Sequence, residues 1–366
     1  MNILLVSFGD YDYDGRLREL CKVFSSIGEL YVICRSSFGV DNPNYSIYKG
    51  NSYYQFIKFA SRYSKYAQKF NIQIIVLDNR KSIIPGLIIR KKCRINYVIQ
   101  DCRELYFAKD TKRIASKIGC IIERPSIKKA NIIICANNYR ADIMKKEYRL
   151  SKTPIVFENL RKLEYSSDVD IEALSIEYSS IIKNDEYRVI ATAGCDIHRL
   201  NDVLVKNIKF VKHKVRLIMV GDSFESDVSK IKDIIHELGL SNVNYLGRVN
   251  QNQLKFLIQN SHVGVVNYGQ YDLNNKYCAS GKLFEFIYEG IPVVTTTNPP
   301  LMDICNSFSV GIADDAFNSG IDKILDNYDY YVEKVVQFGC INTVDNNNRQ
   351  LSDRLIDVLT NAYNKT

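Results

Sequence analysis

Residues 280–297 read SGKLFEFIYEGIPVVTTT, and this stretch sets the pattern for the rest of the sequence. Leu283, Phe286 and Ile287 recur at i, i+3 and i+4, which is the spacing of one face of a helix. The spacing predicts a helix over residues 282–289.

Gly290 follows this helix, and a glycine at that position favours a left-handed residue that ends it. Residues 291–295 are then a short apolar run rich in β-branched side chains, typical of a buried parallel strand. The stretch therefore predicts an α/β unit of the kind found in doubly wound parallel sheets.

The predicted helix begins at a turn of small residues, Ser280 and Gly281. Free N–H groups and the positive end of the helix dipole can hold a phosphate there, and Lys282 adds a positive charge. Glu285 stands one turn later and can accept hydrogen bonds from two hydroxyls. A site for a diphosphate beside a ribose is what a nucleotide sugar requires. The alternative is an ordinary helix with a solvated Lys/Glu pair, and spacing alone leaves both open.

The stretch resembles the nucleotide-binding segment of GT-B glycosyltransferases, especially glycosyltransferase family 4. The family pattern is a small-residue turn, Lys, two apolar residues, Glu, an aromatic residue and then Gly-x-Pro-Val-Val. The matching residues here are Lys282, Glu285, Phe286, Gly290, Pro292, Val293 and Val294. The resemblance extends over nearly the whole chain. It implies an α/β protein of the GT-B class, with two Rossmann-like, doubly wound parallel-sheet domains that face each other across a cleft.

Length and composition agree with this fold class. The 366 residues suit two domains, and 46% hydrophobic with 25% charged residues is typical of a globular protein. The ten cysteines include no Cys-x-x-Cys pair, so we expect reduced thiols in a cytoplasmic protein. The N-terminus is predicted to be a strand and not a signal peptide, and no run approaches the roughly 18 apolar residues of a membrane span.

Charge is distributed unevenly along the chain. Residues 1–165 hold 30 Lys and Arg against 15 Asp and Glu, a net charge of +15, whereas residues 166–366 hold 19 against 26, a net of −7. A basic N-terminal half suits an anionic partner, and we expect the inner surface of the cell membrane. Nucleic acid is not expected as a partner, since the basic clusters match no known binding motif.

Strand and helix patterns alternate twice along the chain. They predict an N-terminal domain over residues 1–160, a polar hinge region over 161–186 and a second domain over 187–345. The resemblance implies that the first is the acceptor domain and the second the nucleotide-sugar-binding domain. The resemblance implies that a C-terminal helix, residues 346–366, packs back on the first domain. The first strand-to-helix loop lacks G-x-G-x-x-G, which disfavours a dinucleotide-dependent oxidoreductase.

In the N-terminal domain, residues 101–105 (DCREL) follow a predicted strand at its carboxyl end, where ligands of open α/β sheets bind. They resemble the family's Asp-x-His-Glu-Leu segment, which lines the cleft near the transferred sugar. Arg103 stands where His is usual. The resemblance implies that Asp101 and Arg103 are catalytic, with Asp101 and Glu104 holding Arg103 in place. Gly15, at the start of the first predicted helix, is a further candidate for donor binding.

In the C-terminal domain the resemblance implies a larger donor site. Arg199 is expected to neutralise the donor diphosphate and to act in catalysis, since the leaving diphosphate gains charge as the glycosidic bond breaks. The expected donor-binding residues are Gly194, Arg199, Gly247, Val249, Gly281, Lys282, Leu283 and Glu285. No Asp-x-Asp motif stands in a convincing place, so no metal site is predicted.

One departure from the family concerns Tyr277, which occupies the position of a second glutamate that usually faces the donor sugar. The resemblance implies a retaining, metal-independent glycosyltransferase without a cofactor. It would transfer a sugar from a UDP- or GDP-sugar to a lipid-linked or oligosaccharide acceptor in bacterial surface polysaccharide assembly. Arg103 and Tyr277 keep a non-catalytic nucleotide- or partner-binding subunit open. A GT-B sugar-nucleotide epimerase is the other alternative, and it would need carboxylates placed for elimination.

Overall fold

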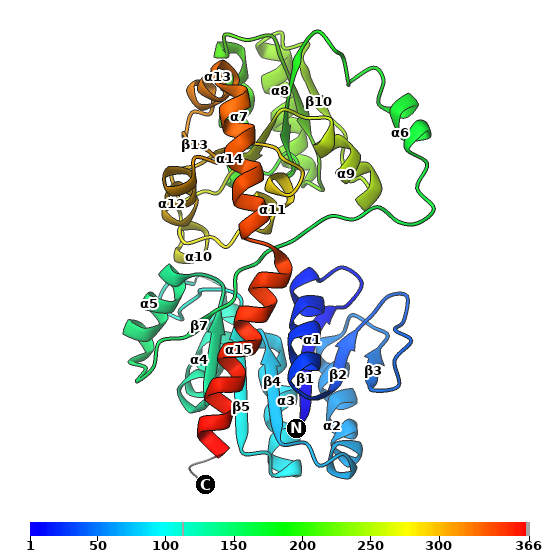
Figure 1. Ribbon diagram of the computed structural model, residues 1–366, viewed down its shortest axis with the longest axis vertical. Helices are drawn as coiled ribbons and strands as arrows, with labels where there is room; N and C mark the ends of the chain where they lie inside the picture. Colours follow the sequence, from blue (N-terminus) through cyan, green and yellow to red (C-terminus); the bar gives the residue numbers. More distant parts are fainter. Residues whose placement is uncertain (112, 364–366) are drawn as a thin grey trace. The chain divides into compact units, whose positions relative to one another are not determined.

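A computed structural model gives the fold and describes residues 1–111 and 113–363. The chain forms two compact units. Unit 1 comprises Met1–Asn159 together with Val344–Thr366, and unit 2 comprises Leu160–Thr343. The chain thus leaves unit 1 once and returns to it at the end. Each unit is built around its own parallel sheet (Figure 1).

Unit 1 contains a 7-stranded sheet of order β3-β2-β1-β4-β5-β6-β7, in which every pairing is parallel. Its strands are β1 (Asn2–Asp10), β2 (Glu29–Arg35), β3 (Tyr45–Tyr48), β4 (Ile74–Asp78), β5 (Tyr97–Cys102), β6 (Ile132–Cys135) and β7 (Ile155–Val156). Its helices are α1 (Gly15–Ile27), α2 (Tyr53–Lys69), the 3-10 turn η1 (Arg80–Ser82), α3 (Ile83–Cys93), α4 (Ile114–Lys129), α5 (Asn138–Tyr148) and α15 (Val344–Tyr363).

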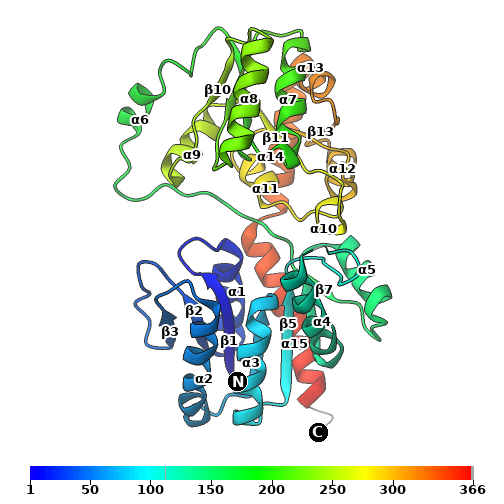
Figure 2. The ribbon, with the colours of Figure 1, turned by 180° about the vertical axis from the view of Figure 1, so that it is seen from behind.

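The sheet of unit 1 buries both faces, because successive side chains of a strand point to opposite sides. Ile3 and Leu5 of β1 pack in one apolar cluster with α1 and α15, while Leu4 and Val6 pack in another with α2. Figure 2, which turns the view of Figure 1 to the back, shows α2, α3 and α4 on the second face. Strands buried on both sides contain continuous apolar runs, as β1, β2, β4 and β6 do.

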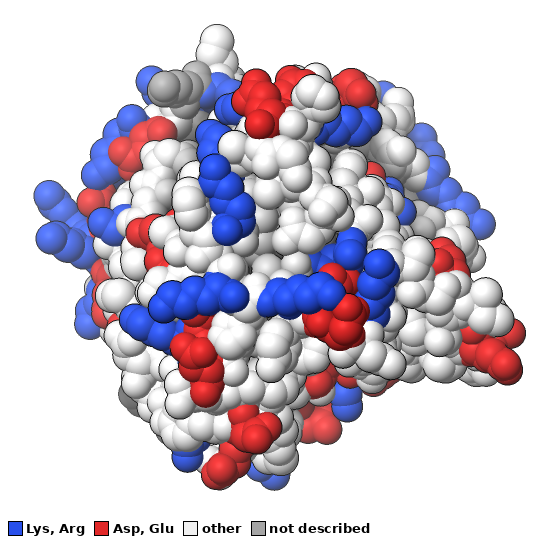
Figure 3. Space-filling model, turned by 90° about the horizontal axis from the view of Figure 1, so that it is seen from above, with Lys and Arg blue, Asp and Glu red and all other residues white. Residues whose placement is uncertain are grey.

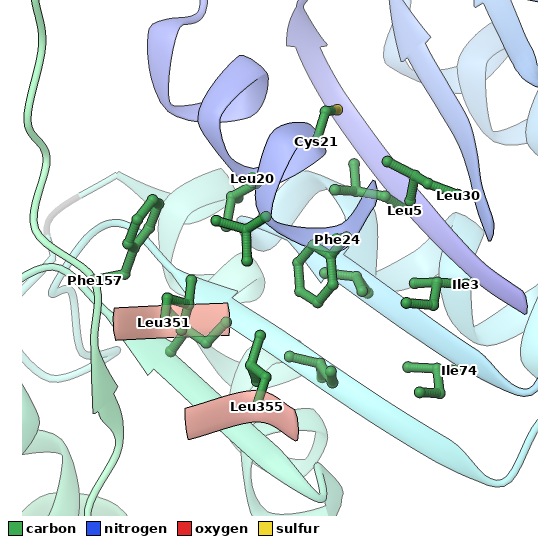
Figure 4. Packing of buried hydrophobic residues seen from close by; sticks show 14 of the residues in the cluster. Ile3, Leu5, Leu20, Cys21, Phe24, Leu30, Ile74, Phe157, Leu351 and Leu355 are labelled. Atoms are coloured by element: carbon green, nitrogen blue, oxygen red, sulfur yellow. The ribbon is translucent and has the colours of Figure 1, made fainter. Parts of the chain in front are cut away.

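The C-terminal helix completes the first of these clusters. Leu351 and Leu355 of α15 share an apolar layer with Leu20 and Phe24 of α1, above Ile3 of the sheet (Figure 4). All five side chains are buried. Helix α15 is therefore part of the core of unit 1, although its sequence lies beyond unit 2.

Unit 2 contains a 6-stranded parallel sheet of order β10-β9-β8-β11-β12-β13. Its strands are β8 (Tyr187–Ala191), β9 (Val215–Met219), β10 (Val243–Tyr245), β11 (Val263–Val266), β12 (Val293–Thr295) and β13 (Gly311–Ala313). Its helices are α6 (Ile171–Glu177), η2 (Ile197–Arg199), α7 (Asn201–Asn207), η3 (Ile208–Phe210), α8 (Glu225–Glu237), α9 (Gln251–Gln259), α10 (Leu273–Lys276), α11 (Gly281–Ile287), α12 (Pro299–Phe308), α13 (Asn318–Asp326) and α14 (Tyr328–Ile341).

The stretch that set the sequence pattern forms α11 and β12. The three residues at helical spacing, Leu283, Phe286 and Ile287, are buried. Gly290 has φ +75°, the left-handed conformation that its place after the helix predicts. The strand is shorter than the apolar run, since it begins only after Pro292, which has no N–H for the ladder. The predicted fold class of two doubly wound parallel sheets is confirmed.

Three further features bear on the sequence-based expectations. The segment predicted as a hinge, residues 161–186, belongs to unit 2 and contains α6. All ten cysteines lie in the described residues, and none of them forms a disulfide. Within residues 1–111 and 113–363, no helix is both long and apolar enough to cross a membrane.

We expect Gly264→Ala to destabilise unit 2, because Gly264 of β11 lies directly under a buried ring. An added Cβ would lie 2.5 to 2.8 Å from ring atoms of Phe286, which is fully buried. Overpacking of this kind costs about 1–3 kcal/mol of unfolding free energy. Chemical denaturation checks the value. Gly339→Ala in α14 is the matched control, since its nearest contact would be 3.4 Å and alanine favours a helix. Equal stability of both variants would contradict the account.

Candidate functional site

The candidate site of unit 2 lies at the carboxyl ends of β8 and β11, where the order of strands reverses. From β8 the chain proceeds outward to β9 and then β10, and from β11 it proceeds outward on the other side to β12 and β13. Ligands of open α/β sheets bind in the crevice at such a reversal. Thr192 directly follows β8, and Asn267 and Tyr268 directly follow β11.

A line of glycines runs along this edge of the sheet. The N–H of Gly221 donates to the carbonyl of Gly247 at 2.8 Å, and the N–H of Gly194 donates to the carbonyl of Val220 at 2.8 Å. Gly194 and Gly221 approach so closely that a Cβ on Gly194 would lie 2.9 Å from the carbonyl oxygen of Gly221. Gly194 also has φ +62° and Gly247 has φ +68°. The close approach requires glycine at position 194, and the left-handed backbone favours glycine at position 247. Both are predicted donor residues, and both lie on this edge.

The start of α11 meets the end of β8 through Lys282. Its ammonium donates to the carbonyl of Thr192. Among the described residues, the buried hydroxyls of Thr192 and Ser280 have no hydrogen-bond partner. Buried polar groups are nearly always satisfied, so unsatisfied hydroxyls on Thr192, which follows β8, and on Ser280, which precedes α11, indicate a place for a polar ligand.

Two arginines add positive charge around Lys282. The guanidinium of Arg199 stacks 3.9 Å from the ring centroid of Tyr268, which fixes it at the carboxyl end of β11. Burial, together with the smaller effects of the charges of Arg199 and Arg161, lowers the pKa of Lys282 to about 8, against the opposing effect of Glu285. A buried lysine whose pKa is lowered by two nearby arginines marks a site that favours an anion.

Glu285 is the acidic member of this cluster. Its side chain is 3% exposed, and its Oε1 lies 2.9 Å from Nε of Arg161, whose side chain is 45% exposed. Burial raises the pKa of Glu285, while Arg161 and Lys282 oppose the rise. Arg161 is thus the residue that neutralises the carboxylate proposed to receive a ribose.

The other predicted donor residues of unit 2 differ in how they can contribute. Gly281 is the first residue of α11 and is half-buried. Leu283 is buried in the core, so only its backbone could face a ligand. Val249 is half-buried beside Asn250, the residue that caps α9.

The candidate site of unit 1 also lies where its strand order reverses, between β1 and β4. Arg103 stands at its centre. Its Nε and Nη2 donate to the two oxygens of Asp78 at 2.6 Å each, and Nη1 donates to Asp14 at 2.5 Å. Ser7 Oγ donates to the same Asp78 carboxylate at 2.5 Å. Two carboxylates thus hold Arg103 on three of its nitrogens.

Asp101 lies beside this group but has a different partner. Arg16 of α1 grips Asp101 with Nε at 2.9 Å and Nη2 at 2.7 Å, and donates through Nη1 to the carbonyl of Phe157 at 2.8 Å. Nε of Arg103 is 3.6 Å from Asp101, beyond hydrogen-bond distance. Asp101 is completely buried and Arg16 nearly so.

This arrangement shifts the titration of Asp78 and Arg103. Burial raises the pKa of Asp78, and Arg103 opposes the rise. Burial alone would lower the pKa of Arg103, but the carboxylates of Asp78, Asp14 and Asp101 raise it, so Arg103 remains charged. A permanently charged arginine cannot exchange protons as the histidine of the family pattern can.

The support of Arg103 differs from the sequence-based expectation. Its hydrogen-bonded carboxylates are Asp78 and Asp14, whereas Glu104 is exposed. Gly15 begins α1 directly after Asp14, in unit 1, and the remaining donor candidates lie in unit 2.

Sequence analysis missed the charged partners of the site: Arg16, Asp14, Asp78 and Arg161. A signal existed for two of them. Asp14 has the place of a helix-capping residue, and its carboxylate does accept the N–H of Leu17 at 3.0 Å. Asp78 ends β4 and is paired in register with Asp101 of β5, so parallel pairing of these two apolar segments would have placed the carboxylates side by side.

We expect Arg161→Met to lower stability in a pH-dependent way. Near pH 7 the buried carboxylate of Glu285 would lose its ion-pair partner, at a cost of about 1 kcal/mol given the solvent screening of the exposed arginine. The pKa of Glu285 is already above its ordinary value of 4.5 and would rise further, so the penalty should vanish as the pH falls through that pKa. Denaturation at several pH values checks this. Lys162→Met is the control, since Lys162 is exposed. A pH-independent penalty would contradict the pairing.

We expect Arg103→Met to be strongly destabilising, by about 3–5 kcal/mol, because it leaves the buried Asp78 without its cation. Arg103→Lys should recover only part of the loss, since a lysine cannot form the two-pronged bond. Urea denaturation measures both. Arg62→Met, at an exposed position of α2, is the control. If Arg103→Met unfolds at the midpoint of the control, the ion pairs contribute nothing to stability.

Comparison with solved structures identifies the fold. HepE from Anabaena, in complex with UDP and glucose, aligns with a TM-score of 0.70 at 14% identity over 97% of this chain and 99% of HepE. WaaG, a glycosyltransferase involved in lipopolysaccharide biosynthesis, aligns with a TM-score of 0.67 at 13% identity over 96% of this chain and 98% of WaaG. No model of a known protein family and no curated protein matches the sequence.

The fold also occurs outside the transferases. A protein from Listeria monocytogenes whose assignment as a UDP-N-acetylglucosamine 2-epimerase is provisional aligns with a TM-score of 0.60 at 10% identity, over 100% of this chain and 97% of that one. At such identities a likeness establishes the fold and not the reaction. The two parallel sheets with alternating helices, together with these likenesses, show that the chain has the GT-B fold.

Proposed function

We propose that this protein is a retaining, metal-independent glycosyltransferase that uses a nucleotide-sugar donor, UDP- or GDP-linked. The observation that carries the proposal is the cluster at the start of α11. Lys282, Arg199 and Arg161 concentrate positive charge there, Glu285 is a buried carboxylate, and two buried hydroxyls lack partners among the described residues. A diphosphate next to a ribose has the complementary chemistry.

Glu285 would receive the two ribose hydroxyls, as the family resemblance implies. In the structure Arg161 occupies that carboxylate. Ribose binding would therefore replace an ion pair with hydrogen bonds and would release Arg161 toward the diphosphate. The buried ammonium of Lys282 and the guanidinium of Arg199 would neutralise the same group. As the glycosidic bond breaks, the diphosphate gains negative charge, and these cations would stabilise it in the way a metal ion does in other transferases.

Unit 1 offers no free proton-exchanging group in its charged cluster, because Asp101 is bound to Arg16 and Asp78 to Arg103. A retaining transfer in which the departing phosphate itself accepts the acceptor's proton needs no such group. In this proposal Asp101 and Arg103 do not exchange protons. Their ion pairs hold the residues at the carboxyl edge of the sheet in place. Tyr277 would stand where a second glutamate usually faces the donor sugar.

The acceptor proposed is a lipid-linked glycan or an oligosaccharide in surface polysaccharide assembly, and the proposed location is the cytoplasm, at the inner face of the cell membrane. Two observations support this part. WaaG, which has the same fold, acts in lipopolysaccharide biosynthesis. Unit 1 also carries 31 Lys and Arg against 17 Asp and Glu, a net charge of +14.

A second function, a non-catalytic subunit that binds a nucleotide or a partner enzyme, is favoured by one observation. Arg103 stands where the family pattern has a histidine, which could exchange protons. The guanidinium of Arg103 is already ion-paired with Asp78 and Asp14. Donor turnover separates the two functions. A subunit would bind the nucleotide diphosphate without transfer and without slow hydrolysis of the donor, whereas a transferase would show one or both.

We expect Glu285→Gln to weaken nucleoside diphosphate binding about tenfold or more. The substitution keeps the shape but removes a charge-assisted bond to the ribose, worth roughly 1.5–3 kcal/mol. Isothermal titration with UDP, GDP and ADP measures the effect and also identifies the base. Glu237→Gln, an exposed glutamate of α8, is the matched control. If Glu285→Gln keeps its fold and binds as tightly as the control does, the donor assignment is wrong.

A further inference from the structure

Helix α4 exposes an apolar ridge. Ile114, Ile118 and Ile121 are 78%, 52% and 58% exposed, and Pro125 is exposed as well. These four positions follow i, i+4, i+7 and i+11, which places them on one side of the helix. Single exposed apolar residues are common, but a continuous ridge of isoleucines on a surface helix requires an explanation.

The opposite side of α4 is fixed to unit 1. Arg80 lies so close to Gly119 that an added Cβ would be 2.7 Å from its Cδ. The same Arg80 grips Glu123 with Nε at 2.9 Å and Nη2 at 2.6 Å, and Ser126 donates to the buried amide oxygen of Gln100 at 2.7 Å. The helix cannot rotate to bury its isoleucines without breaking these bonds.

The charged side chains that α4 itself exposes are all positive. Glu123 is the only acidic residue of α4, and it is buried against Arg80. The basic residues of α4 and its N-cap are all exposed: Arg113, Lys117, Arg124, Lys128 and Lys129. An apolar ridge between cations is the pattern of a helix that lies in the interface of an anionic membrane.

Other occupants fit this surface less well. A second copy of the chain, joined through a two-fold axis, would bring the cations of α4 against the same cations. A nucleic acid would use the charges but leave the isoleucines exposed to water. On the face drawn in Figure 3, basic and acidic side chains are interspersed.

We propose that α4 is the membrane-docking surface of this protein, with Ile114, Ile118 and Ile121 inserted among the acyl chains of an anionic bilayer and the flanking Lys and Arg bound to its headgroups. The inference rests on the membrane location proposed above and is independent of the donor chemistry. The net charge of unit 1 favours attraction to an anionic membrane but does not indicate which surface makes the contact. This proposal assigns the contact to α4.

The test is co-sedimentation of the full chain with vesicles of phosphatidylglycerol and phosphatidylcholine in equal parts. A triple variant, Ile114→Ser, Ile118→Ser and Ile121→Ser, should bind about tenfold more weakly or worse. A second triple variant, Lys117→Gln, Arg124→Gln and Lys128→Gln, should lose about two orders of magnitude, since each cation near the surface contributes about 1 kcal/mol. Binding of the unaltered protein should weaken with salt and be absent with phosphatidylcholine alone.

Matched controls carry the same chemical changes on exposed positions of unit 2. They are Ile171→Ser, Ile176→Ser and Ile341→Ser for the ridge, and Lys230→Gln, Lys232→Gln and Lys323→Gln for the charges. Vesicle binding of the controls should equal that of the unaltered protein. UDP titration should give the same affinity for all variants, which separates failure of this proposal from failure of the donor site.

Three outcomes would overturn the proposal. Vesicle binding that survives both α4 variants would place the contact elsewhere. Equal binding to neutral and anionic vesicles would show that the cations of α4 do not contribute to vesicle binding. A dimer in sedimentation velocity that dissociates in the isoleucine variant, without vesicle binding by the unaltered protein, would show that a second copy covers the ridge.

Discussion

Parallel pairing brings the carboxyl ends of neighbouring strands to one edge of each sheet, and both charged clusters of this protein depend on that constraint. In unit 1 the edge gathers three carboxylates and two arginines, which bind one another almost completely. In unit 2 the same kind of edge gathers three cations around one carboxylate, with hydroxyls still unsatisfied among the described residues. The same topology therefore yields one cluster in which both arginines are ion-paired with carboxylates and another in which cations outnumber the carboxylate.

Local pattern was enough to predict much of the fold. The spacing of Leu283, Phe286 and Ile287, followed by Gly290, fixed a helix and its end, because these features act within a few residues. Contacts between distant residues could not be read in the same way. Arg161 looked like part of a polar linker, and only the folded chain brings it to Glu285. Periodicity indicates which face of a helix or strand is buried. It does not indicate which charged residues from different elements form ion pairs.

Arg103 departs from the family pattern, and neighbouring residues of this chain stabilise it at that position. A buried arginine needs carboxylates close by, because desolvation of its charge is costly. Asp78 and Asp14 meet that need from the end of β4 and from the first loop, and Ser7 donates to the Asp78 oxygen that also accepts from Nη2 of Arg103. The sequence showed the substitution but not these partners, so the position could be assigned to the edge of the sheet while its ion pairs could not.

The placement of α15 has a consequence for how the chain folds as it is synthesised. The core of unit 1 is finished by Leu351, Leu355 and Leu359, which are made after the whole of unit 2. Until they emerge from the ribosome, the apolar side of α1 has no cover, although the sheet beneath it is complete. Unit 2 is continuous in sequence and can close its own core earlier. Unit 1 begins to be translated before unit 2 but is completed after it. Until α15 is made, the uncovered apolar side of α1 is a surface through which the chain can aggregate.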